Sequence, residues 1–216
     1  GSSTGLEPWS GRMAMLDTTS GATASNDWYA CCNNWTRNKF NGSPADAMSL
    51  CGNYGQASGG YTNDPAMQNA LWSNNRFTAD QEMQVRVRWF VVHRQKDSDD
   101  PNDDVCTRLR RNIMGTTTTW NQNCDSPNIN WTGCGHAGTN CGSGSTGQNW
   151  VGWNSQGWTG FITLNAGDTI WLESQKVTSS DSSMYQCGYD YYGQSCVSPW
   201  GFSYIEFEVE SAAAEV

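Results

Sequence analysis

The stretch EMQVRVRWFVVHRQ, Glu82 to Gln95, decides the fold. Apolar residues occupy every second position in it, and most positions between them are polar. A period of two is that of a β-strand, whose successive side chains point to opposite faces of a sheet. We therefore predict a strand with one buried and one solvated face. The buried face holds Met83, Val85, Val87, Trp89, Val91 and His93, and the other holds Gln84, Arg86 and Arg88.

Shorter alternating runs predict further strands. The last, FSYIEFEVE, places Ile205, Phe207 and Val209 opposite Tyr204, Glu206 and Glu208. In ITLNAGDTIWLESQ (Ile162 to Gln175), the quartet Asn165-Ala166-Gly167-Asp168 predicts a turn that pairs its two flanking runs as a β-hairpin. Many short strands with little helix predict an all-β, antiparallel two-sheet sandwich. The other expected strands lie around 105–113, 116–121, 150, 161–164 and 169–174.

The first 80 residues show weaker patterns. We expect residues 1–76 to form an irregular, cysteine-stapled extension packed on a β-sandwich of residues 77–216, so that the whole chain is one compact domain. Two short helices are predicted in the extension, because a polar residue followed by proline favours a helix start. They run from Ser43 through Leu50 and from Asp64 through Trp72.

Nine cysteines occur without any C-x-x-C pair, so disulfides are expected rather than a zinc site. Two pairs, Cys134 with Cys141 and Cys187 with Cys196, are spaced to close short loops. The adjacent Cys31 and Cys32 are expected to reach different partners. An odd number leaves one thiol free or bonded to another chain. The remaining cysteines are Cys51, Cys106 and Cys124, and N-x-S/T sites for glycosylation lie at Asn34, Asn41 and Asn130.

Composition and charge exclude several classes of partner. The formal net charge is −9, which repels nucleic acid and anionic membranes. No apolar run approaches the roughly 20 residues that a membrane-spanning helix needs. Only 15% of residues are charged, while Gly, Ser, Thr and Asn are abundant and 12 tryptophans occur. This composition is typical of a secreted, loop-rich β-protein.

Three phrases, FTADQEMQVRVRWFVV, GFITLNAGDTIWLES and WGFSYIEF, together resemble the jelly roll of the tumour-necrosis-factor and complement globular-head superfamily. The resemblance runs from Phe77 to Glu210. The family has no counterpart of the first 75 residues or of the cysteine-rich segment 123–147. Tyr204 stands where the family has a closing glycine. The matching residues are Phe77, Ala79, Trp89, Leu164, Gly167, Asp168, Ile170, Leu172, Phe202, Ser203 and Ile205.

The resemblance implies that the closing strand lies beside the central strand in one sheet. Arg86 and Arg88 would then face Glu206 and Glu208, and opposite charges on neighbouring strands help to fix the register. The alternative is that the arginines and the glutamates simply form two solvated faces.

Two groups of residues are candidate binding sites, and a third group is better explained by a disulfide. The loop DSDDPNDD holds five carboxylates, which could bind calcium, although a solvated loop is the alternative and the EF-hand spacing is absent. Cys134, His136 and Cys141 could be metal ligands, but a disulfide beside a bystander histidine is the better interpretation. Tryptophans 150, 153 and 158 could stack on sugar rings, or could instead cover the core or a subunit interface. The two groups are Asp97, Asp99, Asp100, Asp103 and Asp104, and Trp150, Trp153 and Trp158.

No Ser/His/Asp or Cys/His arrangement is legible, and nothing nominates a pair of catalytic carboxylates. We therefore expect a non-catalytic protein with no cofactor other than a possible calcium ion. An odd cysteine and many tryptophans favour a secreted structural or adhesive protein that self-assembles, as trimers by the resemblance or as filaments. The alternative is a carbohydrate-binding module or lectin that uses the tryptophans on an extracellular glycan. The third hypothesis is a jelly-roll enzyme acting on glycans.

Overall fold

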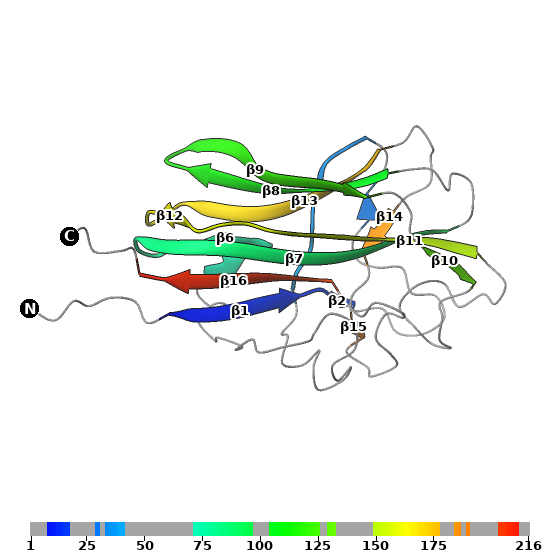
Figure 1. The fold of residues 1–216 in the computed structure, drawn as a ribbon, viewed down its shortest axis with the longest axis horizontal. Coiled ribbons are helices and arrows are strands. Elements are labelled where there is room, and N and C mark those ends of the chain that lie inside the picture. The colour runs from blue at the N-terminus through cyan, green and yellow to red at the C-terminus, as the bar shows by residue number, and fades with distance from the viewer. Residues whose placement is uncertain are drawn as a thin grey trace, which may run out of the picture.

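A computed structural model of the chain describes residues 8–17, 29–30, 33–41, 71–96, 104–125, 129–132, 149–177, 184–186, 189–190 and 203–211. The elements assigned there are all β-strands (Figure 1). The predicted all-β class is thus confirmed. The strands are β1 (Trp9–Ala14), β2 (Leu16–Asp17), β3 (Tyr29–Ala30), β4 (Thr36–Arg37), β5 (Trp72–Ser73), β6 (Arg76–Thr78), β7 (Met83–Lys96), β8 (Asp104–Ile113), β9 (Thr116–Asp125), β10 (Ile129–Thr132), β11 (Asn149–Trp158), β12 (Ile162–Leu164), β13 (Thr169–Val177), β14 (Met184–Gln186), β15 (Tyr189–Asp190) and β16 (Tyr204–Glu210).

The first sheet, called the β7 sheet, is built around the longest strand. Its order is β1-β16-β7-β11-β10, and all of these pairs are antiparallel. Because β7 is long, it is flanked by two strands on each side. β11 and then β12 pair with one edge, and β14 and then β16 pair with the other.

The second sheet, called the β13 sheet, has the order β5-β6-β13-β8-β9, with β4 also paired to β13. β8 and β9 form a hairpin in which Met114 and Gly115 both have positive φ, as a two-residue turn between twisted strands requires. The separate pair β2 and β15 is parallel.

The principal strands follow the order of a jelly roll. Numbered in sequence as β1, β6, β7, β8, β9, β11, β13 and β16, they give the orders 1-8-3-6 in the β7 sheet and 2-7-4-5 in the β13 sheet. Strands adjacent in a sheet are therefore mostly distant in sequence. Figure 1 shows this for β16, which lies between β1 and β7.

The core lies between the two sheets and follows the predicted alternation. All five apolar residues of the inner face of β7 are buried, as is His93. Ile205, Phe207 and Val209 of β16 join the same cluster. Phe207 stacks on Phe77 of the other sheet with ring centroids 4.5 Å apart. The predicted alternation and buried faces are thus confirmed, but the opposite face is only partly solvated: Arg86 and Arg88 are exposed, whereas Phe90, Tyr204 and Glu206 are buried.

The predicted hairpin over Ile162–Gln175 is wrong. β12 pairs with β7, whereas β13 pairs with β6 and β8, so the turn between them crosses from one sheet to the other. Its local chemistry is as expected, since Gly167 has φ +93° and Asp168 N–H donates to the Asn165 carbonyl. Alternation and turn residues fix where strands end, but not which strands pair.

The first 80 residues are not irregular throughout. β1 pairs with β16 along its whole length, and β4, β5 and β6 belong to the β13 sheet. The division at residue 76 stays a prediction. Of the second predicted helix, Trp72 lies in β5, whereas residues 64–70 and the first predicted helix lie outside the described residues.

Candidate functional site

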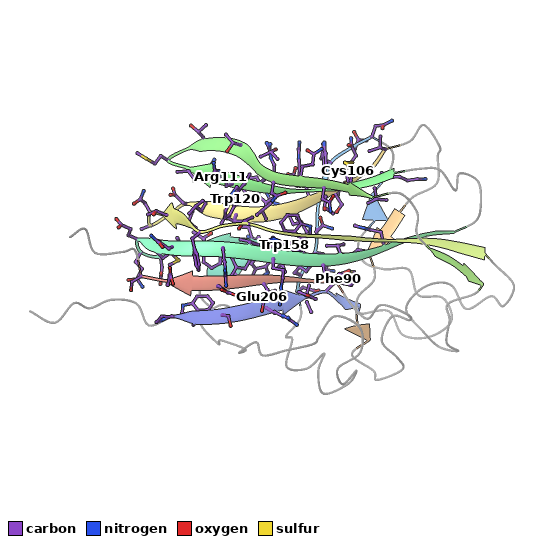
Figure 2. All side chains as sticks on the ribbon, viewed as in Figure 1. Phe90, Cys106, Arg111, Trp120, Trp158 and Glu206 are labelled. Atoms are coloured by element: carbon purple, nitrogen blue, oxygen red, sulfur yellow. A yellow bond between two sulfur atoms is a disulfide. The ribbon has the colours of Figure 1, made fainter. Side chains whose placement is uncertain are left out.

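A row of directly opposed residues crosses the outer face of the β7 sheet. Arg12 of β1 faces Glu206 of β16, Glu206 faces Arg88 of β7, and Arg88 faces Trp158 of β11. The Arg88 Nε donates to Glu206 Oε2 over 2.7 Å, and Arg12 Nε lies 3.3 Å from Glu206 Oε1. The register thus joins two arginines, one carboxylate and an indole across four strands. Figure 2 labels the carboxylate residue, Glu206, and the indole residue, Trp158.

A second row runs beside the first. Ser10 faces Glu208, and Glu208 faces Arg86, whose Nε donates to Glu208 Oε2 over 2.5 Å. The Arg86 guanidinium also lies 5.0 Å from the centre of the Phe161 ring. The predicted facing of Arg86 and Arg88 with Glu208 and Glu206 is therefore confirmed.

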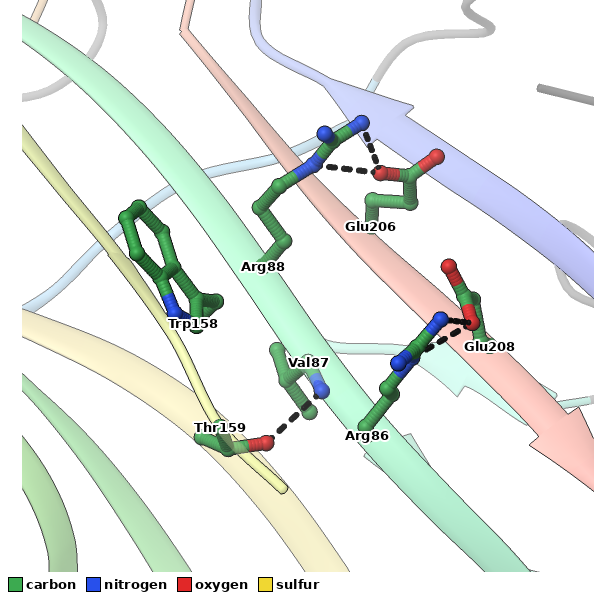
Figure 3. A pocket seen from close by; sticks show the side chains of 7 residues that line it. All are labelled: Arg86, Val87, Arg88, Trp158, Thr159, Glu206 and Glu208. Carbon is green, nitrogen blue, oxygen red and sulfur yellow. Dashed lines mark hydrogen bonds and ion pairs between the residues drawn. The ribbon is translucent and has the colours of Figure 1, made fainter. Parts of the chain in front are cut away.

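A groove of about 300 Å³ lies over these rows. It is bounded on one side by Trp158 and Thr159 and on the other by the two ion pairs (Figure 3). The Trp158 residue is 69% exposed. Side-chain exposure is 48% for Arg86, 46% for Arg88 and 42% for Glu208, so these three charged groups remain accessible although they are paired.

Beyond this groove lies a second hollow, also of about 300 Å³. Phe161 and Glu208 line it together with Trp9, Ser10 and neighbouring residues at the ends of β1 and β16. Glu208 lines both hollows. The outer face of the β7 sheet thus offers two adjoining recesses with exposed aromatic and charged groups.

The position of Trp158 is set by its neighbours. A Cβ at Gly157 would lie 2.3 Å from Cζ2 of Trp89, so the buried Trp89 indole occupies the space that a side chain at 157 would need. After Trp158 the strand β11 ends, and Thr159 makes two further hydrogen bonds to β7. Its N–H donates to the Val87 carbonyl and its Oγ1 accepts from Val87 N–H. These contacts hold the strand end against β7, with Trp158 on the side facing solvent.

Unlike Glu208, Glu206 is buried. Its side chain is only 6% exposed, and the neighbouring outer-face residues Phe90 and Tyr204 are also buried and stacked on each other. Arg12, which is buried too, lies 4.3 Å above the Tyr204 ring. Burial raises the pKa of Tyr204 above its usual value. Glu206 is therefore the buried carboxylate of the groove, and Glu208 is its solvent-facing carboxylate.

The three predicted tryptophans all fall on β11. Trp150 faces Lys96, Trp153 faces His93 and Trp158 faces Arg88. At about 3.3 Å per residue, Trp150 lies roughly 26 Å along the strand from Trp158. The three residues thus lie along one strand instead of at one point, and Trp158 lines the groove.

The other predicted sites are placed only in part. No group that could hold a metal ion occurs within the described ranges, while Asp97, Asp99, Asp100, Asp103 and Cys134, His136 and Cys141 lie outside them. Asp104 begins β8. Asn34 and Asn41 are exposed, and Asn130 belongs to β10.

One disulfide is placed, joining Cys106 of β8 to Cys124 of β9 at directly opposite positions. The sequence alone leaves the partners of these two cysteines open. The remaining cysteines, Cys31, Cys32, Cys51, Cys134, Cys141, Cys187 and Cys196, lie outside the described residues.

Sequence reasoning missed Phe161 and Thr159 as parts of the groove. Both lie in the break between β11 and β12, where residues leave the strict alternation on which the predictions depended. A signal was present in the run Trp-Thr-Gly-Phe, since a glycine within a strand pattern often marks a bulge or a tight bend.

The groove presents a flat indole beside fixed hydrogen-bonding groups. The guanidinium N–H groups donate, the Glu208 carboxylate accepts, and the indole offers an apolar face. Because the arginines are already paired, the groove has little net charge to attract an ion. It suits a neutral ligand that has both an apolar face and many hydroxyl groups.

A comparison with protein-family models finds none that matches the chain, and a comparison with curated proteins finds no match either. Among the described residues, no helix has the length and apolar character needed to cross a membrane.

Proposed function

We propose that this protein is a secreted, non-catalytic carbohydrate-binding protein, and that the Arg86–Arg88–Trp158–Glu208 groove binds a neutral glycan. The observation that carries the proposal is the 69% exposed Trp158 beside two accessible Arg–Glu pairs. The disulfide Cys106–Cys124 supports an oxidising compartment such as the cell exterior.

Sugar rings have the chemistry that this groove offers. The C–H faces of a pyranose stack on an aromatic ring, and its hydroxyl groups both donate and accept hydrogen bonds. Arg86 and Arg88 supply donors and Glu208 supplies an acceptor, and the ion pairs hold all three in place before binding. Preorganised polar groups lose little entropy when a ligand binds.

The test is retention on insoluble cellulose, chitin, xylan and mannan, followed by titration with soluble oligosaccharides of the retained type. Trp158→Ala is expected to weaken binding at least tenfold, because truncation of a central tryptophan typically costs about 2 kcal/mol or more. Met114→Ala is the matched control, since Met114 is also exposed but lies in the β8–β9 turn. Equal retention of both variants would disprove the assignment of this groove.

A second candidate function is self-association, and the observation that favours it is the edge strand β9. Among the described strands, β9 pairs only with β8 and so ends the β13 sheet on that side. Residues Thr116 to Thr119 are all exposed, and neither a charged residue nor proline occurs between Thr116 and Asn123. Such an uncharged, β-branched edge lacks the features that usually prevent strand addition.

Sedimentation over a range of protein concentrations tests self-association. Thr118→Lys places a charge on the β9 edge and is expected to reduce any oligomer to monomer, whereas Thr163→Lys, an exposed site on β12, should have no effect. Wild-type protein that remains monomeric at every concentration would exclude this second function.

A further inference from the structure

The groove and the second hollow on the outer face of the β7 sheet adjoin at Glu208, which lines both of them. The groove lies beside Trp158, and the second hollow lies where β1 begins and β16 ends. Because the two recesses share a lining side chain, a ligand that is long enough can occupy both at once.

The two recesses follow each other along β7. In the groove, Trp158 faces Arg88, and Arg86 with its ion pair comes two residues nearer the start of the strand (Figure 3). In the second hollow, Val209 faces Val85, which is one residue nearer still. From Arg88 to Val85 the strand advances by three residues, or about 10 Å. This path is longer than one sugar ring, but two linked rings can span it.

Each recess has its own exposed aromatic side chain. Trp158 borders the groove, and Phe161, which is 40% exposed, lines the second hollow. The Arg86 guanidinium lies 5.0 Å from the Phe161 ring centre and is also paired with Glu208, so polar groups lie between the two aromatic positions. Apart from its chain neighbours, no described atom lies within 4 Å of a Cβ built at Gly160. The segment that joins the two aromatic residues thus leaves space beside it.

The charges that line the two recesses favour a neutral ligand. Arg86 and Arg88 are paired with Glu208 and Glu206, and Glu210 adds a further carboxylate in the second hollow. The carboxylates outnumber the guanidinium groups, so an anionic chain such as a polyuronate would be repelled. The hydroxyl groups of a neutral chain can instead donate to the carboxylates and accept from the arginines.

The residues at the two ends of the path are exposed. Trp158 is 69% exposed at one end, and the exposed Pro8 lines the second hollow just before β1 at the other. A site that holds only the terminal sugar of a glycan needs a wall that stops the chain. Exposed ends allow a chain to continue past both recesses.

We infer that the groove and the second hollow form one continuous site for the interior of a linear, neutral polysaccharide, with sugar units stacked on Trp158 and on Phe161. The inference rests on the glycan binding proposed above, and it adds the class of glycan and a second stacking residue. When one chain makes both contacts, the second contact forms within the complex. Affinity should therefore rise with chain length until both recesses are filled.

Calorimetric titration with cello-, chito-, xylo- and manno-oligosaccharides, each as the disaccharide and the hexasaccharide, tests this inference. In the series that the protein binds, the wild type should bind the hexasaccharide at least tenfold more tightly than the disaccharide, which exceeds the gain expected from the larger number of sugar units alone. Phe161→Ala should reduce this affinity ratio about fivefold or more, because the second stacking contact is lost.

Val177→Ala is the matched control, since Val177 is exposed to a similar extent, 42%, but ends β13 in the other sheet. Its affinity ratio should equal that of the wild type. Far-ultraviolet circular dichroism and thermal unfolding verify that both variants are folded.

The outcomes separate this inference from the function on which it rests. A ratio that falls in Phe161→Ala but not in Val177→Ala supports the continuous site. Equal affinities of the wild type for both lengths, or an unchanged ratio in Phe161→Ala, would overturn the continuous site while glycan binding in the groove stands. Tighter binding of oligogalacturonate than of any neutral series would overturn the class of glycan. Failure to bind any oligosaccharide or polysaccharide would overturn both the proposed function and this inference.

Discussion

At the scale of single residues, His93 shows how strongly the core constrains chemistry. It occupies the inner-face parity of β7, where it is fully buried, and burial lowers its pKa to about 3 from the ordinary 6.5. The imidazole therefore stays neutral in the folded chain at every pH where the protein would ordinarily be handled. His93 is therefore a neutral group of the core.

His93 should make the protein acid-sensitive. Below pH 6.5 the unfolded chain binds a proton at this site that the folded chain does not, so stability falls by about 1.4 kcal/mol per pH unit until the folded pKa near 3 is reached. Unfolding free energies at pH 7 and 4.5 should therefore differ less in His93→Gln than in the wild type, by about 2.7 kcal/mol. An imidazole NMR signal of His93 that titrates near pH 6 would contradict this prediction.

Glu206 and Glu208 both form ion pairs with arginines, but we expect them to contribute very differently to stability. Glu206 is buried between Arg12 and Arg88, so Glu206→Gln leaves the buried Arg12 without its carboxylate and should cost about 3 kcal/mol. Glu208 is 42% exposed, and Glu208→Gln should cost less than about 1 kcal/mol. Urea denaturation of both variants measures the difference. Equal losses of unfolding free energy would mean that burial does not make Glu206 more important for stability than Glu208.

At the scale of elements, the end of β11 depends on the fit between Gly157 and Trp89. Because a Cβ at 157 would overlap the indole, Gly157→Ala should destabilise the chain by about 1–3 kcal/mol through overpacking. Gly160→Ala is the control, since no atom lies within 4 Å of a Cβ built there and its φ is ordinary. Thermal unfolding of the two variants provides the measurement, and a Gly157→Ala protein as stable as the control would refute the packing argument.

Elements also mark the limit of what the sequence could predict. The alternation of β7 and β16 identified the buried face and, through a family resemblance, the facing of Arg86 and Arg88 with Glu208 and Glu206. The β12–β13 connection was predicted as a hairpin because its turn residues are the same in a hairpin and in a crossing between sheets. Phe161 was missed because its exposure depends on Thr159, whose contacts with Val87 are distant in sequence. The local sequence pattern predicted the strands and their buried faces. The residues that line the groove were instead determined by pairing between strands that are distant in sequence.

At the scale of the whole molecule, the jelly roll separates two surfaces of different chemistry. The β7 sheet presents an aromatic groove with paired charges, and the β13 sheet presents Arg108 and Arg110 beside Glu173. Because the two sheets face each other through the core, their outer faces point in opposite directions. A ligand in the groove of the β7 sheet would therefore not obstruct the outer face of the β13 sheet.

The two sheets are joined at a corner that depends on Asp168. Its Oδ1 accepts from Met114 N–H in the β8–β9 turn, and its Oδ2 accepts from Asn165 N–H. Its main-chain carbonyl accepts from Ala79 N–H, between β6 and β7. One buried residue therefore links three connections that are distant in sequence, and it does so where the chain passes from the β7 sheet to the β13 sheet.

Removing this carboxylate should weaken the whole sandwich. Asp168→Ala leaves two backbone N–H groups without their charged acceptor, and at about 1.5–3 kcal/mol for each such bond, less what water recovers, a total loss of about 2–4 kcal/mol is expected. Asp80→Ala is the control, because Asp80 is exposed and close in sequence to the same corner. Equilibrium denaturation followed by both tryptophan fluorescence and far-ultraviolet circular dichroism should still give one coincident transition, shifted only for Asp168→Ala. If that variant were as stable as Asp80→Ala, the corner would be held by its main-chain bonds and the packing of the core alone.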